Sequence, residues 1–105
     1  MRYWICAVAF AVSAQVSAAD IEAGRKKAQE VCAACHGPEG NSATADFPRL
    51  AGQYADYLAK ALRDYKAGVR KNAIMGAMAQ PLTAQDIENM AAYYAAQPGP
   101  LKSLY

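Results

Sequence analysis

The sequence C-A-A-C-H at residues 32–36 constrains this chain more than any other feature. Two thiols three residues apart on a helical turn can each form a thioether bond to one vinyl group of a porphyrin. The histidine directly after the second thiol is then held beneath the ring, where its Nε2 can bind iron. The motif therefore predicts one covalently attached haem c, bonded to Cys32 and Cys35, with His36 as an axial iron ligand.

Other uses of a C-x-x-C pair fit this sequence less well. A thioredoxin-like redox pair expects a strand before the motif and a helix after it, whereas here a helical pattern precedes the motif and a loop rich in glycine and proline follows. A zinc site needs four ligands, and residues 20–105 contain no further cysteine or histidine. A structural disulfide would not require His36.

The first nineteen residues have the pattern of an export signal. A short positive start precedes an uncharged apolar run at residues 3–12. Residues 13–19 (SAQVSAA) are small or polar and end in the small-x-small pattern that a signal peptidase cuts. Cleavage after Ala18 and cleavage after Ala19 fit this pattern equally well.

The alternative to cleavage is a retained membrane anchor. The uncharged stretch of residues 3–19 is at the short limit for crossing a bilayer, and its second half is Ala, Ser and Gln rather than Leu or Ile. We therefore expect a cleaved signal peptide at residues 1–19 and a periplasmic domain at residues 20–105, without stable membrane insertion. Cleavage removes Cys6, so the motif pair is all that remains of the three cysteines.

The domain at residues 20–105 is short of large apolar side chains. Of its 86 residues 42 are apolar, but 19 of these are alanine, which leaves 23 larger ones. That is a marginal core for a domain of this size, so we expect haem to complete the core and the haem-free chain to be poorly folded. Ten basic and nine acidic residues give a net charge of +1, which does not indicate a nucleic-acid partner.

Three helices and no strand are predicted, which makes the domain all-α. The first helix runs from about Ile21 to Ala34, with Asp20 as N-cap. The second begins near Gly52 and ends at Gly68, a natural helix stop. Its apolar residues recur with the 3.6-residue period of a helix: Tyr54, Tyr57, Leu58, Ala61, Leu62 and Tyr65.

The third helix has the clearest start. Thr83 is the predicted N-cap and Asp86 returns its bond in a variant of the capping box, while Leu82 and Ile87 can form a hydrophobic staple. Pro98-Gly99-Pro100 ends this helix. Two long loops, residues 37–53 and 69–81, separate the three helices and are expected to wrap round the haem.

The sixth iron ligand must be a side chain other than histidine, and thioether sulfur is the obvious donor. Met90 lies on the apolar stripe of the third helix, where core packing explains it. Met75 and Met78 lie in the second predicted loop, and Gly76 beside Met75 permits close approach to a flat ring. The residues themselves favour Met75 only slightly, so Met78 stays open as the alternative.

With the motif placed, residues 20–97 resemble class I c-type cytochromes, and among them the single-haem bacterial c-553 type and one half of dihaem cytochrome c-4. A single CxxCH excludes the dihaem form for this chain alone. C-x-x-C-H indicates haem only, whereas FPRLAGQ is far more specific to this branch. The segments that carry the resemblance are CAACHG at 32–37, FPRLAGQ at 47–53, residues 54–68, MGAMAQPLT at 75–83, and residues 86–94.

The resemblance implies thioether bonds at both motif cysteines and proximal ligation by His36. It implies Met75 as the axial methionine, because that residue precedes Leu82 by the branch's seven-residue spacing. It also implies that the carbonyl of Pro48 accepts a hydrogen bond from His36 Nδ1, which orients the ligand.

Other positions of the resemblance are less specific. Gly24 and either Tyr93 or Tyr94 resemble the family's contact between first and last helices. Three loop residues can be either haem-propionate contacts or ordinary solvated side chains: Arg49, Arg70 and Asn72.

We therefore expect a monomeric periplasmic carrier that passes single electrons between redox proteins, which dock transiently at the haem edge. No nucleophile–base pair or second metal site accompanies the motif, so no enzymatic activity is expected. One alternative is a haem subunit held permanently in a dehydrogenase or reductase complex, with the tail at residues 98–105 as a docking segment. A haem sensor or peroxidase-like protein, with an open iron site, is another.

Overall fold

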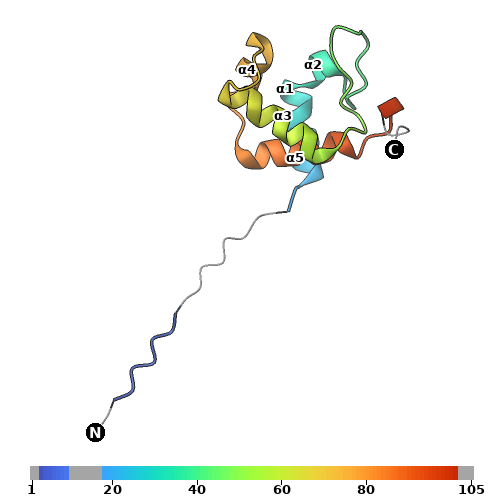
Figure 1. Cartoon of the computed structure of the whole chain (residues 1–105). Helices are drawn as coiled ribbons and strands as arrows, with labels where there is room; N and C mark the ends of the chain where they lie inside the picture. Colours follow the sequence, from blue (N-terminus) through green and yellow to red (C-terminus); the bar gives the residue numbers. More distant parts are fainter. Residues whose placement is uncertain (1–2, 10–17, 102–105) are drawn as a thin grey trace.

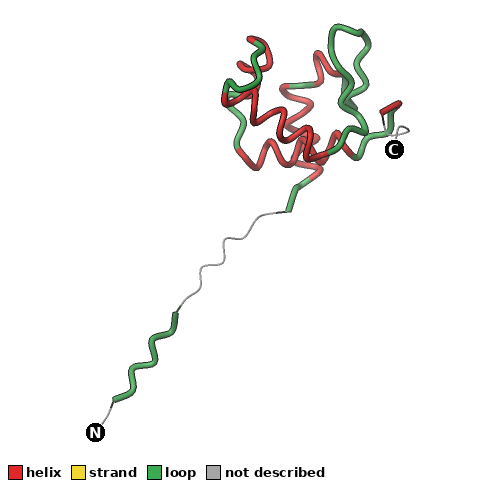
Figure 2. Tube along the Cα trace, viewed as in Figure 1, coloured by secondary structure: helices red, strands yellow, loops and turns green. Residues whose placement is uncertain are grey.

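A computed structural model describes residues 3–9 and 18–101 of the chain. The described residues form five α-helices, which are labelled in Figure 1, and they contain no strand (Figure 2). The prediction of an all-α domain is therefore confirmed. The helices are α1 (Ile21–Val31), α2 (Ala33–His36), α3 (Ala55–Ala67), α4 (Ala73–Ala79) and α5 (Ala84–Ala95).

The first helical segment ends earlier than predicted. Asp20 caps α1 as expected, since its side chain accepts a hydrogen bond of 3.0 Å from the backbone N–H of Ala23. A turn at Cys32 then separates α1 from the single turn of α2, so the prediction of one helix to Ala34 is wrong at its end. The backbone N–H of His36 donates to the Cys32 carbonyl at 3.0 Å and closes the single turn of α2.

The second predicted helix is α3, which begins at Ala55 rather than near Gly52. Gly68 ends it in the left-handed conformation (φ 76°), and its N–H donates to carbonyls of the last turn. The residues of the predicted apolar stripe differ in burial. Leu58 is buried in the core, whereas Tyr54 and Tyr57 are about half exposed.

The second predicted loop, residues 69–81, contains a helix. The side chain of Asn72 accepts hydrogen bonds of 3.0 Å from the backbone N–H groups of both Ile74 and Met75, and so caps α4. The prediction that this stretch is a loop is wrong, because Asn72 caps a run of helix-favouring alanine and methionine. Gly76 lies inside this run without ending it.

The last helix confirms its predicted start. Asp86 N–H donates to the Thr83 hydroxyl oxygen, and Thr83 N–H donates to the Asp86 carboxylate, both at 3.0 Å, which completes the capping box. Leu82 and Ile87 are each only 2% exposed, as the predicted staple requires. The helix ends at Ala95, shortly before Pro98.

The core forms where α1 and α3 pack against α5, and α4 packs against α3 (Figure 1). Gly24 lets α1 approach α5 closely, but the atoms nearest to it belong to Asn89 and Met90 rather than to either tyrosine of the predicted contact. The buried apolar residues of this core are Ala28, Leu58, Ala59, Ala79, Leu82, Ile87, Met90, Ala91, Tyr93 and Tyr94.

Two predicted end segments are described only in part. Residues 3–9 of the expected signal peptide are exposed and non-helical, and residues 10–17 lie outside the described residues. In the tail, the side-chain amide of Asn41 donates to the Pro98 carbonyl at 3.0 Å, whereas residues 102–105 lie outside the described residues. Nowhere in the described ranges is a helix long and apolar enough to cross a membrane.

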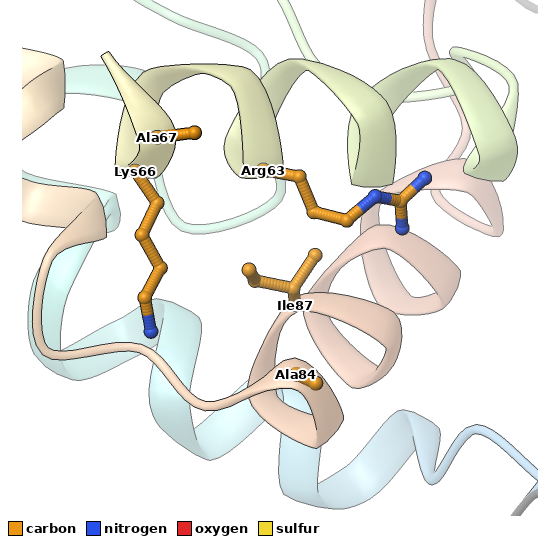
Figure 3. Close-up of a pocket in the computed structure, with 5 residues that line it drawn as sticks. All are labelled: Arg63, Lys66, Ala67, Ala84 and Ile87. Atoms are coloured by element: carbon orange, nitrogen blue, oxygen red, sulfur yellow. The ribbon is translucent and has the colours of Figure 1, made fainter.

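A groove of about 400 Å³ lies between α3 and α5, and Figure 3 shows Arg63, Lys66 and Ile87 among its lining residues. Its two cationic side chains already have partners. Arg63 pairs with Glu88 at 3.0 Å, and the Lys66 ammonium donates to the Leu82 carbonyl. None of the lining residues belongs to the C-A-A-C-H motif.

Candidate haem site

His36 lies at the end of α2 and is 6% exposed. Its Nδ1 is 2.8 Å from the carbonyl oxygen of Pro48. With the proton on Nδ1, the ring donates to this carbonyl, and the lone pair of Nε2 is then available to a metal. The Phe47 ring lies beside the imidazole in a T-shaped arrangement, with the two ring centroids 6.4 Å apart.

The loop after α2 brings Pro48 back to the histidine. Gly37 begins it with a φ of 83°, and a Cβ at this position would lie 2.7 Å from the Asn41 carbonyl oxygen, so only glycine fits. The Ser42 hydroxyl then donates to the carbonyl of Phe47 at 2.5 Å, directly before Pro48. These local bonds hold the carbonyl that orients His36.

The two motif cysteines differ in exposure. Cys32 is half-buried and Cys35 is exposed, and both are free thiols, so no disulfide competes with thioether formation. Burial raises the pKa of the Cys32 thiol, and the nearby Tyr94 hydroxyl partly offsets that rise. The Cys32 sulfur also lies 4.0 Å from the sulfur of Met90 in α5.

The structure separates the three candidate methionines by environment. Met90 is fully buried in the core, which agrees with its interpretation as a packing residue. Met75 and Met78 both lie on α4, one helical turn apart, where Met75 is half-buried and Met78 is 45% exposed. Helix α4, rather than a flexible loop, therefore positions both candidate sulfur ligands.

Several large apolar side chains are exposed in this small domain. They come from the loop before α3, the start of α3 and helix α4, and they are Phe47, Tyr54, Tyr57, Ile74 and Met78, with exposed fractions of 36% to 64%. Apolar side chains that are exposed in this way can be covered by a bound apolar group. Together with two free thiols and an oriented, buried imidazole, they suit a flat apolar macrocycle that carries iron.

Two of the three loop residues considered as haem-propionate contacts make other contacts in the structure. Asn72 caps α4, and the Arg70 guanidinium lies over the Tyr65 ring at 4.8 Å from its centroid. Arg49 is exposed. These contacts favour structural roles for Asn72 and Arg70.

One polar group at the site was missed by the sequence reasoning. Tyr94 is 3% exposed, and its hydroxyl oxygen is buried without a hydrogen-bond partner in the described part of the chain. Its neighbour Tyr93 instead donates to the Pro38 carbonyl at 2.8 Å. Two adjacent tyrosines on one helix offer no pattern that distinguishes the unpaired hydroxyl, because their partners come from distant loops.

Several curated relatives of this chain are named as cytochromes. A cytochrome c4 from Thiocapsa roseopersicina is 52% identical over 79 residues, which cover 75% of this chain and 41% of that protein. Cytochrome c-554(548) from Halomonas halodenitrificans is 42% identical over 83 residues, covering 76% of this chain and 99% of that protein. A thiosulfate dehydrogenase electron acceptor from Thiomonas intermedia is 47% identical over 64 residues, which cover 60% of this chain and 30% of that protein.

The chain thus spans less than half the length of the cytochrome c4 relative, but nearly the whole length of the Halomonas protein. Among solved structures, reduced recombinant cytochrome c4 from Pseudomonas stutzeri superposes with a TM-score of 0.73 at 47% identity. The match covers 78% of this chain and 47% of that one. The predicted cytochrome c fold is confirmed by this likeness.

The family model described as Cytochrome c matches residues 21–96, which include α1 to α5 and the complete C-A-A-C-H motif. The cofactor implied by that motif is therefore haem c, covalently bound and carrying one iron. Since the match covers more than half of the chain and the fold agrees, this chain belongs to the cytochrome c family.

Proposed function

We propose that this chain is a mono-haem electron carrier that exchanges single electrons between redox proteins. The observation that carries the proposal is the buried His36, whose Nδ1 is engaged by the Pro48 carbonyl so that the lone pair of Nε2 is available to a metal. Bound haem supplies reversible one-electron exchange between ferric and ferrous iron. The cytochrome names of the relatives support the same function.

Each residue of the proposed site has a separate task. The Cys32 and Cys35 sulfurs would fix the ring to the chain, and His36 would bind the iron. Met75 from α4 supplies the sixth ligand, with Met78 as the alternative. A thioether ligand raises the reduction potential relative to a second imidazole.

This ligand set also argues against enzymatic turnover. With His36 and Met75 both bound, an iron held here would have no coordination position left for a substrate, and electrons would pass through the haem edge. A haem sensor or a peroxidase-like protein needs an open coordination position on the iron. The proposed pair of ligands leaves no such position and so distinguishes the carrier from both.

We further propose that residues 1–19 are removed on export and that residues 20–105 act in the periplasm. The small-x-small pattern at residues 17–19 supports cleavage directly before Asp20 or one residue earlier. N-terminal sequencing of the haem-stained protein from a periplasmic fraction should begin at Ala19 or Asp20. A protein that still begins at Met1 and pellets with membranes would contradict cleavage.

Partners are expected to dock briefly and with little long-range attraction. The net charge of +1 becomes about −1 if both haem propionates ionise, and the ion pairs of the described residues lie on the surface, where they contribute little. Weak steering of this kind suits a small, transient interface.

One further candidate function has a specific observation behind it: the Thiomonas relative is named as the electron acceptor of a thiosulfate dehydrogenase. The alternative is accordingly that this chain is a permanent subunit of a dehydrogenase or reductase complex. Size-exclusion chromatography of the native protein distinguishes the two. A carrier elutes as a free monomer, whereas a subunit co-elutes with a larger enzyme.

A potentiometric titration followed by visible spectra tests the main proposal. The expected result is one reversible one-electron transition and no rapid binding of carbon monoxide by the ferrous protein at neutral pH. Rapid carbon monoxide binding would show an open iron site and would overturn the His/Met carrier.

A further inference from the structure

Asn41 lies in the loop after α2, and its side chain contacts the segment that follows α5. The amide nitrogen Nδ2 donates to the Pro98 carbonyl at 3.0 Å, across 57 residues of sequence. The amide oxygen is buried against the next residue of that segment, because a Cβ built on Gly99 would lie 2.6 Å from it. One hydrogen bond and close packing therefore join the loop to residues 98–99, beyond the end of α5 (Figure 1).

The two residues beside Asn41 hold a later stretch of the same loop. The Gly40 carbonyl accepts a hydrogen bond of 2.8 Å from the backbone N–H of Leu50. The Ser42 hydroxyl donates to the Phe47 carbonyl at 2.5 Å, and Ser42 is buried. These two bonds bracket the residues between Phe47 and Leu50, so a shift of the backbone at Asn41 would move those residues as well.

Pro48 is one of the bracketed residues, and its carbonyl oxygen lies 2.8 Å from His36 Nδ1. Asn41 also meets the residue that follows the histidine, since a Cβ built on Gly37 would lie 2.7 Å from the Asn41 carbonyl oxygen. The backbone at Asn41 is thus linked to both sides of the bond between His36 and Pro48. The proposed function assigns no task to this arrangement.

We propose that Asn41 is a positioning residue: its side chain anchors the loop to residues 98–99 and thereby keeps the Pro48 carbonyl within hydrogen-bonding distance of His36. The inference rests on the proposed function, because it assumes that His36 binds an iron that gains and loses one electron. A hydrogen bond donated by Nδ1 makes the imidazole a more basic ligand, and a more basic ligand stabilises ferric over ferrous iron. Asn41 therefore lowers the reduction potential.

The substitution Asn41→Ala tests this, with Gln97→Ala as the matched control. Each wild-type side chain donates an amide N–H to a backbone carbonyl at 3.0 Å, but Gln97 binds the Tyr93 carbonyl four residues before it. Asn41→Ala should favour haem reduction by about twofold or more, and twofold is about 18 mV for a one-electron couple. Gln97→Ala should keep the wild-type potential. An unchanged or lowered potential in Asn41→Ala, or equal shifts in both variants, would overturn the proposal.

The sign of the shift separates positioning from general loosening of the site. A loosened site that loses its methionine ligand should have a lower potential, because methionine ligation raises it. The proposal requires a higher one.

Gly99→Ala keeps Asn41 and disturbs it from the other side of the contact. The added Cβ would meet the amide oxygen, which is the end of a side chain that can shift, so the protein should fold with the amide displaced. Its potential should rise as in Asn41→Ala. A wild-type potential in Gly99→Ala would overturn the proposal even if Asn41→Ala did not fold.

NMR of the reduced haem protein gives a second readout, at the hydrogen bond itself. The Nδ1–H proton of His36 should exchange with D₂O at the same slow rate in wild type and in Gln97→Ala. In Asn41→Ala and Gly99→Ala it should exchange about threefold faster or more, because the acceptor is held less firmly. Equal exchange rates in all four proteins would overturn the proposal.

Failure of this inference is distinguishable from failure of the proposed function. If all four proteins show a reversible one-electron titration with identical potentials, Asn41 does not position the histidine and the carrier function stands. If wild type binds carbon monoxide rapidly, the carrier function fails first.

Discussion

The backbone of Gly24 packs directly on that of Asn89, because a Cβ built on Gly24 would lie 2.1 Å from the Asn89 carbonyl oxygen. This contact sets the distance between α1 and α5. It also fixes the end of α1, where the Cys32 sulfur meets Met90 one residue beyond Asn89. The packing of Gly24 on α5 thus helps to set where the first haem-binding sulfur lies.

Gly24→Ala should therefore destabilise the haem protein by about 2–3 kcal/mol, since overpacking against backbone atoms forces the helices apart. Gly68→Ala is the control: nothing lies within 4 Å of its added Cβ, so it should cost only the ~1 kcal/mol of a left-handed non-glycine residue. Denaturant unfolding followed by the haem absorbance measures both. Equal losses in the two variants would contradict the close approach of α1 and α5.

Removing the cap of α4 should loosen the proposed methionine ligand. Asn72→Ala deletes the acceptor for two backbone N–H groups and should cost about 1 kcal/mol. Because the same helix carries Met75, the weak near-infrared band of sulfur bound to ferric iron should disappear at a lower temperature than in wild type. Asn72→Asp keeps the acceptor oxygen and should behave like wild type. An unchanged band in Asn72→Ala would show that the cap does not support the ligand.

The identity of that ligand has its own test. Met75→Ala should abolish the near-infrared band and open the iron to added imidazole, whereas Met78→Ala should keep the band. The physical reason is that Met75 is half-buried on α4 while Met78 is 45% exposed. The reverse pattern would assign Met78 as the ligand and leave Met75 as a packing residue.

Local sequence signals predicted those parts of the fold that short-range chemistry decides. The capping box of Thr83 and Asp86, the Asp20 cap and the stop at Gly68 all depend on residues within one turn, and all three occur in the structure. Helix α4 was missed because Gly76 and the neighbouring Pro81 resemble loop residues. The Asn72 cap outweighs these two signals.

Long-range relationships were less predictable. The close approach of α1 to α5 is present, but Gly24 meets Asn89 and Met90 rather than Tyr93 or Tyr94, since the crossing point depends on how the whole helices pack. The unpaired hydroxyl of Tyr94 likewise depends on where the loop and Cys32 come to lie. A sequence pattern carries no information of this kind.

The haem-free chain should not fold cooperatively. Among the described residues the largest fully buried side chains are Leu82 and Met90, and Phe47, Tyr54 and Tyr57 are partly exposed. Residues 20–105 produced with Cys32→Ala and Cys35→Ala should therefore show partial helicity by far-UV circular dichroism and a gradual thermal change. The haem protein should give a sharp transition in the same buffer. A sharp transition in the haem-free chain would contradict the idea that haem completes the core.

Alkaline stability should depend on Tyr94. Burial is the largest cause that raises the pKa of Tyr94 above its ordinary value of 10.0, and this cause does not depend on whether Cys32 is a thiol or a thioether. The folded protein thus holds this phenol proton more tightly than the unfolded chain does. Its contribution to the free energy of unfolding is therefore constant below about pH 10 and falls above it, by up to about 1.4 kcal/mol per pH unit.

Denaturant unfolding of the haem protein at about pH 9 and about pH 11 should show a steeper loss in wild type than in Tyr94→Phe, because other groups that titrate there contribute equally to both proteins. Parallel losses would mean that the Tyr94 hydroxyl ionises as easily in the folded protein as in the unfolded chain.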